Sequence, residues 1–549
     1  MNTRRILYVS SLYLLLGSYT SLAGERTERE MLAIAQQKLQ GMGGTRSAQT
    51  IEKLTEAEQY AIYGSDQNGF VVVSRDDRYH AVLAYSSNRF QVKSIPCGMQ
   101  WWLNAISEVM ENDTMDNRVM TRGQSYTVVE PFINTLWGQG DPYNFLTPEI
   151  NGQHAPSGCV ATAMSQIMKY YTYPAQGKGM GYYTIEGNSS RVTEKISGVY
   201  KWDEMQNSYK TYELMDEQRL PVASLMKDAG LATHMEYGTG GSGAFDVVSA
   251  RGFAYNFSYD SLAIHAYTRD FFDQEEWMST VYGELAAKRP ILYCGIDPGA
   301  GGHAFVFDGV DKDGYIHVNW GWNGDGDGYF DINDLQPKGK KYHFNSDQSM
   351  VYGFKCQESP DANEKYQSLW YTYNPYKLSI DGKIFIFESD YVYNFHFLYF
   401  YGVIGIFFKN LDGDTSKDTF KVVKDMSDHA VATFFGYGDL SSSFFLTGIK
   451  TGNYRVYLAS KATNEDYCQP VRVPGGALCY DLTINADGSL SLSGAKFITS
   501  SSDNDVTGIQ ATKVKPSERS VLYDLRGRQV SGEPQRHGIY IQDGKKVVK

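Results

Sequence analysis

The sequence predicts an α+β protein built from several domains. Its 549 residues are several times the length of a typical domain, so the chain can bury more than one hydrophobic core. Between residues 123 and 356, apolar side chains first recur at helical spacing and later form short strand-like runs, a pattern typical of an α+β domain. From 357 to 500, short alternating segments are separated by turn residues, as in a β-sandwich.

Residues 1–23 predict a secretory signal peptide. Arg4 and Arg5 precede a short apolar stretch that ends near Leu16, and small residues lead up to Ala23, after which we expect cleavage. A membrane anchor is the alternative, but a spanning helix needs about twenty apolar residues, and serines and a glycine interrupt this run. The sequence therefore favours export over anchoring.

Residues 24–122 predict a small α+β unit of their own. Helical spacing at 27–42 and at 100–112 flanks a strand-like run around Val71–Val73. The polar, charged link at 111–125 predicts an exposed boundary where a protease could cut.

Two later segments predict strands. The apolar run Phe395–Phe408 is too short to cross a membrane, and its aromatic residues and glycines suit buried strands of the sandwich. The last residues, 510–549, predict a small β-rich segment.

Charge and cysteine content exclude several classes of function. The net charge is −12 and the chain has no long Lys/Arg run, which argues against nucleic acid or an anionic membrane as the main partner. Six cysteines without a CxxC pair suit neither a disulfide scaffold nor structural zinc. No metal or other cofactor is expected. Cys468 and Cys479 lie in a strand-rich region and could form a disulfide, which the sequence leaves open.

A lone cysteine at a predicted helix start is the first candidate for chemistry. Apolar residues from Val160 to Tyr171 recur every three or four positions, which predicts a helix with one buried face. We expect Ser157 as its N-cap and Pro174 beyond its end. The first turn favours the thiolate of Cys159, because unpaired N–H groups and the helix dipole stabilise negative charge there. A small core residue is the other interpretation, since free cysteines are often buried.

Later residues supply the partners that a cysteine nucleophile requires, namely a base and a group that orients it. His303 enters a predicted strand from a glycine-rich loop and Asn319 ends the next strand, so a hairpin would bring them together. The separations, 144 residues from Cys159 to His303 and 16 from His303 to Asn319, fit a papain-type order of Cys, His and Asn. Upstream, Gln139 could donate its amide to a developing oxyanion.

Two features offer alternatives. His154 lies five residues before the cysteine and is a rival base, although a loop histidine is the simpler interpretation. Residues 323–334 match several positions of a calcium-binding loop, but Asp334 stands where that loop needs glutamate and the flanks resemble strands. A tight hairpin turn is therefore expected there.

The sequence resembles the streptopain-like cysteine peptidases of the papain superfamily. The resemblance rests on four motifs between Val128 and Leu335: WGQGDPYN, GQHAPSGCVATAMSQIMKYY, GGHAFVFDGV and VNWGWNGDGDGYF. It extends upstream to about residue 60 through GFVVVSRDDRYHAVLAYSS and WWL. By this resemblance 123–356 would form a two-lobed papain-like catalytic domain, and 24–122 would be an inhibitory prosegment.

The resemblance also implies a role for each matching residue. Cys159 would be the nucleophile, His303 the base and Asn319 its orienting partner. Trp320 would shield that pair, and Gln139 would be an oxyanion donor.

The expected protein is a secreted cysteine endopeptidase that acts on proteins or peptides and carries its own prosegment as an inhibitor. No nucleic acid partner and no stable membrane insertion are expected. A cysteine transglutaminase or amidase is an alternative, although it often has aspartate where Asn319 stands. An adhesin with an inactive peptidase domain is another, and the intact site residues argue against it.

The end of the chain carries a short additional resemblance. Residues 521–549 look like the C-terminal sorting domains of the type IX secretion pathway of Gram-negative bacteria, although a final hairpin of the sandwich would look similar. Together with the signal peptide, this resemblance would imply a location outside such a cell or on its surface.

Overall fold

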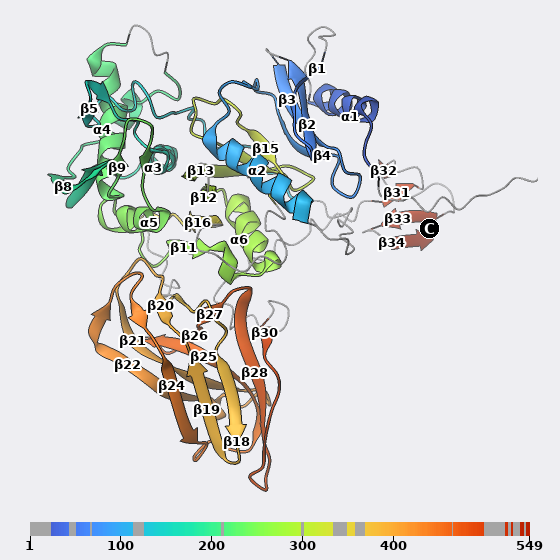
Figure 1. The fold of residues 1–549 in the computed structure, drawn as a ribbon, viewed down its shortest axis with the longest axis vertical. Coiled ribbons are helices and arrows are strands. Elements are labelled where there is room, and N and C mark those ends of the chain that lie inside the picture. Colours follow the sequence, from blue (N-terminus) through green and yellow to red (C-terminus); the bar gives the residue numbers. More distant parts are fainter. Residues whose placement is uncertain are drawn as a thin grey trace, which may run out of the picture.

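The computed structural model describes residues 24–42, 51–65, 68–112, 126–209, 214–297, 301–332, 348–356, 368–463 and 465–498, with short strands between 522 and 548. The predicted signal peptide and the centre of the 111–125 link lie outside these residues. Among the described helices, none combines the length and the apolar character that crossing a bilayer requires. The α+β class is confirmed, since the described residues combine a few helices with many strands (Figure 1).

The N-terminal unit packs helix α1 (Glu28–Gly41) on a small antiparallel sheet. A capping box starts α1, because Thr27 accepts a hydrogen bond from the Glu30 N–H while the Glu30 side chain accepts from the Thr27 N–H. Met31 and Ala35 form its buried face. The other elements are β1 (Glu52–Glu56), β2 (Tyr60–Ser65), β3 (Asn68–Ser74), β4 (Val82–Ser86) and α2 (Cys97–Asn112).

These N-terminal strands are part of a larger sheet, in which β4 pairs with β15 of the following domain. The sheet runs β1-β2-β3-β4-β15-β14-β13-β12-β16-β11. Its later strands are β11 (His265–Thr268), β12 (Ile291–Asp297), β13 (Gly301–Val310), β14 (Ile316–Asn319), β15 (Gly328–Phe330) and β16 (Gln348–Tyr352). Ala84 pairs with Phe330, so the N-terminal unit and the next domain share one backbone hydrogen-bond network.

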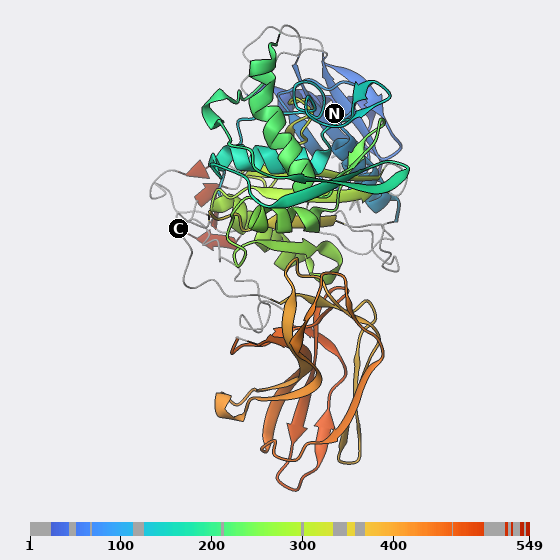
Figure 2. The same cartoon turned by 90° about the vertical axis from the view of Figure 1, so that its left-hand side faces the viewer.

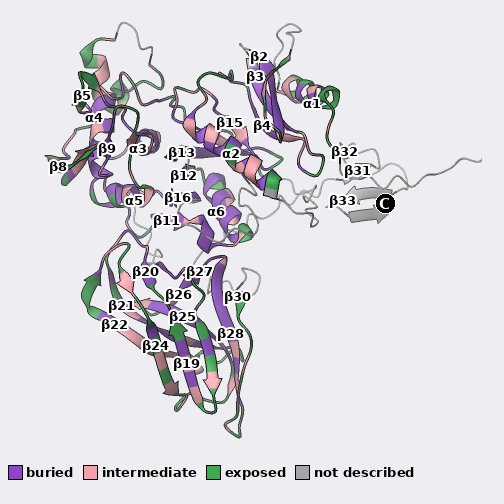
Figure 3. Cartoon of the chain, in the orientation of Figure 1, coloured by how far each residue is buried: buried purple, intermediate pink, exposed green. Residues whose placement is uncertain are grey.

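The two faces of this sheet bury two separate cores. Helices α2 and α6 (Gln274–Ala286) pack on one face, and α3 (Cys159–Tyr171), α4 (Asp216–Ala232) and α5 (Asp246–Tyr255) cover the other. Figure 3 shows the strands buried between them. A second sheet with the order β10-β9-β7-β8 lies beside α4. Its strands are β7 (Met180–Ile185), β8 (Asn188–Lys195), β9 (Glu236–Tyr237) and β10 (Ser242–Gly243).

Short elements complete this domain. They are β5 (Glu149–Ile150), β6 (Gln153–His154) and the 3-10 turns η1 (Trp202–Glu204) and η2 (Arg269–Phe271).

Residues 368–498 form a β-sandwich, which lies below the sheet-and-helix body in Figure 2. One sheet has the path β22-β21-β25-β28-β27-β17-β20-β23 and the other β18-β19-β24, with a shared core in which Phe385 contacts Phe408. The longer strands are β21 (Phe400–Asn410), β22 (Thr419–Val431), β25 (Gly452–Ala462) and β28 (Gly476–Ile484). The shorter elements are β17 (Trp370–Tyr371), β18 (Lys377–Asp381), β19 (Ile384–Ser389), β20 (Val392–Asn394), η3 (Thr415–Lys417), β23 (Gly436–Tyr437), β24 (Leu440–Phe445), β26 (Gln469–Pro470), β27 (Arg472–Val473), β29 (Leu490–Leu492) and β30 (Lys496–Ile498).

The end of the chain forms a separate small sheet. Its order is β32-β31-β33-β34, from β31 (Leu522–Asp524), β32 (Gln529–Val530), β33 (Ile539–Gln542) and β34 (Lys545–Val548). The strands expected in this segment are present, and most of its intervening residues lie outside the described part.

Candidate active site

Cys159 is the first residue of α3, as the sequence predicts, but the helix is capped differently. Gly158 is the N-cap, with φ of +88° and no side-chain hydrogen bond, whereas Ser157 was expected there. The Ser157 hydroxyl instead lies 3.3 Å from Thr162 Oγ1. The positive φ favours glycine at this position, and a Cβ on Gly158 would also lie 3.1 Å from the Ser242 carbonyl oxygen.

Helix α3 is more deeply buried than its sequence pattern indicates. Every residue from Val160 to Met168 is buried, although the spacing predicted a single buried face. The reason is that α4 and α5 pack on α3 from one side while β12 and β13 pack on it from the other. The nucleophile candidate is thus fixed by a helix that has little freedom to shift.

Helix α3, which begins with Cys159, lies next to β13, the strand that carries His303 (Figure 1). The Cys159 side chain packs with the core on the α3 face of the sheet, together with Cys294 and Ala304. On β12 and β13, Cys294 pairs with Ala304 and Gly295 pairs with His303.

Successive side chains in a strand point to opposite faces, so His303 lies on the other face from Ala304. That face belongs to α2, because a Cβ on Gly295, the partner of His303, would lie 2.1 Å from the Trp101 ring. With residues 24–112 in place, the sheet backbone therefore separates the Cys159 thiol from the His303 ring. The spacing argument placed these residues on adjacent elements but did not anticipate opposite faces.

The surroundings of Cys159 favour its neutral form. Burial raises the pKa of its thiol above the usual value, and the backbone N–H groups of Ala304 and Val160 lower it by less. The helix N-terminus alone would favour the thiolate, but burial opposes it more strongly, so the neutral thiol is favoured here. Nearby Cys97, the first residue of α2, also raises the pKa of the Cys159 thiol.

Asn319 is held in place by residues that the sequence did not single out. It pairs with Val306 on β13, three residues from His303, which is about 10 Å along a strand. Its Nδ2 donates to Thr135 O at 2.8 Å, and its Oδ1 accepts from the Gly321 N–H at 3.0 Å. The remaining hydrogen bonds of its amide run to Gln166 of α3.

Trp320 is buried and fixed at both ends. Its backbone N–H donates to Asp327 Oδ1 at 2.8 Å, and its indole Nε1–H donates to Gly326 O at 3.1 Å. Burial raises the pKa of the Asp327 carboxyl to about 7. The N-terminal unit covers this tryptophan, since a Cβ on Gly98 of α2 would lie 2.6 Å from the ring.

Gln139 lies beside the start of α3. Its carbonyl accepts a hydrogen bond from the Ser157 N–H at 3.0 Å, and Thr162 Oγ1 donates to the preceding carbonyl, that of Gly138, at 3.3 Å. The residue is half-buried.

The competing features take other places. The His154 ring bonds to Thr147 O at 2.7 Å through Nδ1 and lies 3.6 Å from Glu149 through Nε2. The segment after Asn319 forms the turn between β14 and β15, as expected, and Asp325 accepts from Gln91 there. Cys468 carries a free thiol, so a disulfide with Cys479 is not formed.

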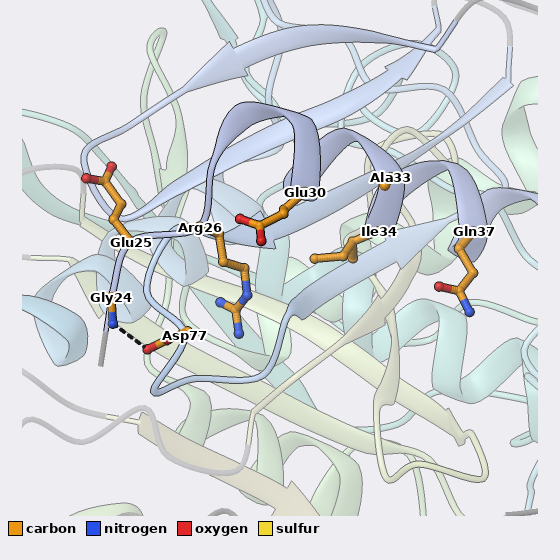
Figure 4. A pocket seen from close by; sticks show the side chains of 8 residues that line it. All are labelled: Gly24, Glu25, Arg26, Glu30, Ala33, Ile34, Gln37 and Asp77. Atoms are coloured by element: carbon orange, nitrogen blue, oxygen red, sulfur yellow. Dashed lines mark hydrogen bonds between the residues drawn. The ribbon is translucent and has the colours of Figure 1, made fainter. Parts of the chain in front are cut away.

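A surface hollow of the N-terminal unit lies elsewhere (Figure 4). Residues at the start of α1 line it together with Asp77, which accepts a hydrogen bond from the Gly24 N–H at 2.9 Å. Neither Cys159 nor His303 borders this hollow. Among the described residues, no group of three or more His, Cys, Asp or Glu side chains is arranged to hold a metal ion.

Comparison with known proteins finds a matching family for the N-terminal unit and for the domain that follows it. Residues 137–330 match the Peptidase C10 family, and residues 23–110 match the Spi protease inhibitor family. Streptopain of Streptococcus pyogenes serotype M28 is 33% identical over 350 residues, which cover 57% of this chain and 86% of streptopain. The thiol protease/hemagglutinin PrtT of Porphyromonas gingivalis is 29% identical over 396 residues, 66% of this chain and 45% of that protein.

A solved structure is also similar in sequence. A fragment of Prevotella intermedia prointerpain A is 33% identical, covers 56% of this chain and 98% of the fragment, and superposes with a TM-score of 0.49.

Proposed function

Because this chain belongs to the streptopain-like Peptidase C10 family of cysteine peptidases, we propose that it is a secreted endopeptidase, made as a zymogen, with Cys159 as nucleophile and His303 as base. The observation that carries the proposal is the position of Cys159, at the first turn of a buried helix and against the strand of His303. A helix N-terminus lowers the cost of a thiolate once the thiol is exposed to substrate.

The reaction is acyl transfer to water. His303 takes the thiol proton of Cys159 as the sulfur attacks the scissile carbonyl carbon, and the C–N bond breaks as His303 passes this proton to the leaving amine. His303 then takes a proton from water as the water attacks the thioester carbonyl carbon. The C–S bond breaks, the acid is released, and His303 returns the proton to the Cys159 sulfur. The Cys159 N–H and the Gln139 amide donate hydrogen bonds to the oxyanion. Asn319 orients the imidazole, and Trp320 shields that pair from water.

The zymogen state follows from the two faces of the sheet. Trp101 of α2 occupies the face to which His303 is directed. Removal of the prosegment, residues 24–122, would uncover that face and allow the end of β13 to present His303 to Cys159. The inhibitor-family match over residues 23–110 supports this assignment.

We assign the remaining parts as follows. Residues 1–23 are the signal peptide, 123–356 the catalytic domain, 357–500 an accessory β-sandwich and 510–549 a sorting-like segment. The protein acts on protein or peptide substrates outside a Gram-negative cell or at its surface.

A hydrolysis assay tests this function. The wild-type chain, after trimming by a trace of active enzyme, should digest casein, whereas C159A and H303A should show native circular dichroism and no digestion. The new N-terminus should lie between Asn112 and Val128. Trimmed wild-type protein that digests neither casein nor a small peptide would contradict the proposal.

A further inference from the structure

Gln166 and Asn319 form a reciprocal amide pair between α3 and the end of β14. Gln166 Nε2 donates to Asn319 Oδ1 at 3.0 Å, and Asn319 Nδ2 donates to Gln166 Oε1 at 3.2 Å. The Gln166 side chain is fully buried and that of Asn319 is 2% exposed, so water cannot replace either bond.

Backbone groups decide which way both amides face. The Trp137 N–H donates to Gln166 Oε1 at 3.4 Å, which directs Nε2 toward Asn319. Asn319 in turn places Nδ2 against Thr135 O and Oδ1 against the Gly321 N–H. A reversed Asn319 amide would set oxygen against oxygen and donor against donor.

The pair joins three parts of the proposed site. Gln166 lies two turns after Cys159 on α3, about 10 Å along the helix axis, too far to touch the reacting carbonyl. Thr135 Oγ1 also donates to Gln166 Oε1, at 2.9 Å, and the segment from Thr135 leads directly to Gln139. The third part is the end of β14, where Asn319 directly precedes Trp320.

We propose that Gln166 is a positioning residue for peptide hydrolysis, acting through Asn319. This inference rests on the proposed function, because Asn319 matters to the reaction only if it orients His303. Both lone pairs of Asn319 Oδ1 are occupied, by Gln166 and Gly321. An imidazole can therefore donate to this oxygen only in place of the Gly321 N–H, and Gln166 then keeps the amide fixed in direction. Loss of the Gln166 donor would let the asparagine amide rotate away from its productive orientation.

The test compares Q166L, Q166E and N319A with a control on the same helix, S165A. Ser165 is fully buried, and its hydroxyl has no hydrogen-bond partner among the described residues. All variants are trimmed by added active enzyme, and a thiol-directed epoxide titrates the competent Cys159 in each. The kinetic constants for a small peptide are then expressed per titrated site.

We expect Q166L to lower kcat by about tenfold or more and to leave KM nearly unchanged, while S165A keeps wild-type kcat. The double variant Q166L/N319A should be no slower than N319A alone, because the two residues act as a unit. A wild-type kcat for Q166L would overturn the proposal. A double variant in which the kcat losses of Q166L and N319A add in full would also overturn it.

Q166E supplies a second readout and remains informative if Q166L does not fold. A carboxylate cannot donate to Asn319 Oδ1, but a protonated carboxyl can. The activity of Q166E relative to wild type should therefore rise as the pH falls. Because burial raises the pKa of the introduced carboxyl, this rise should occur at a higher pH than for an exposed glutamate. A ratio that does not change with pH would contradict the role of Gln166 as a donor. Wild-type protein without hydrolysis would instead refute the proposed function itself.

Discussion

Arg472 of the β-sandwich and Glu276 of α6 form a buried, two-point ion pair. Arg472 Nη2 lies 2.6 Å from Glu276 Oε1, and Nη1 lies 3.0 Å from Oε2. The two side chains are 4% and 5% exposed. Arg472 also donates to Phe271 O at 3.0 Å and lies 4.0 Å from the centre of the Phe272 ring. The sandwich is thus attached to the catalytic domain by a charged contact that excludes water.

We predict that R472M destabilises the chain strongly. The substitution leaves Glu276 buried without its cation, and removal of one partner of such a pair costs about 3–5 kcal/mol. Thermal unfolding of the C159A protein, which cannot digest itself, measures the effect. The control K201A breaks an ion pair with Glu204 in which the side chains are 65% and 51% exposed, and it should change little.

The double variant R472M/E276M should recover much of the loss, because apolar residues often replace a buried ion pair at little cost. A wild-type unfolding temperature for R472M would contradict a tight attachment of the sandwich.

Trp102 should control how long the zymogen survives. Its indole is fully buried, donates to Asp331 O at 2.8 Å and meets the Phe330 ring edge-on, so it fastens α2 to the catalytic sheet. W102A removes about 3–5 kcal/mol of packing and should speed conversion to the trimmed form on a gel time course. N104A changes an exposed residue of the same helix and serves as control. Equal conversion rates for W102A and wild type would show that this contact does not limit activation.

The sequence predicts local features better than contacts between distant segments. Helix α3, the strands of residues 368–498 and the turn after Asn319 follow from periodicity and turn residues, which are local signals. The pairing of Ala84 with Phe330 is not visible in either segment alone, so the prosegment appeared as a separate unit. The prediction of Ser157 as the N-cap of α3 was wrong, because the chain enters the helix through Gly158 with a φ of +88°, which favours glycine and which the helical periodicity does not reveal.

The sequence proposes which residues form the site, but it does not predict their arrangement. The sequence pattern assigned Cys159 to a helix start and His303 to a strand, which are α3 and β13. The face to which His303 is directed depends on its register with Gly295, which that pattern does not predict. Gln166 gave no signal of its own, because a single glutamine in an amphipathic pattern usually faces solvent. A polar residue within a helix that is buried on all sides would have been the clue, and only the structure shows that burial.

Acid should weaken the junction between the sandwich and the catalytic domain. Burial lowers the pKa of His396 to about 3 and that of His265 to about 4. In the unfolded chain both would titrate near the ordinary value of 6.5. The unfolded state therefore gains protons first as the pH falls, and stability present above pH 6.5 is lost progressively down to the folded values.

The variant H396N isolates this effect. His396 Nδ1 accepts a hydrogen bond from the Leu398 N–H at 3.0 Å, and an asparagine oxygen can accept in its place without taking up a proton. In the C159A background, H396N should show a shallower fall in unfolding temperature with acid. H429N, at a histidine whose side chain is 50% exposed, should keep the original slope. Parallel slopes for H396N and its parent would refute the assignment.

The prosegment should make Cys159 slow to alkylate at neutral pH. Burial raises the pKa of its thiol above 9.0, so the reactive thiolate in the full-length chain becomes abundant only at high pH. After trimming, iodoacetamide should modify the Cys159 peptide faster and at lower pH, as followed by mass spectrometry. Buried Cys294 serves as the internal control for unfolding. Identical pH profiles before and after trimming would contradict this effect of the prosegment.

The identity of the nucleophile is tested most directly by covalent labelling of the trimmed protein. A thiol-directed epoxide should add one equivalent per chain, on Cys159, and peptide hydrolysis should fall in proportion to the label. C159A, trimmed in the same way and with native circular dichroism, should take up no label and hydrolyse no peptide. Hydrolysis by C159A above about one thousandth of the wild-type rate, or full inhibition with the label on another residue, would contradict the assignment of Cys159 as the nucleophile.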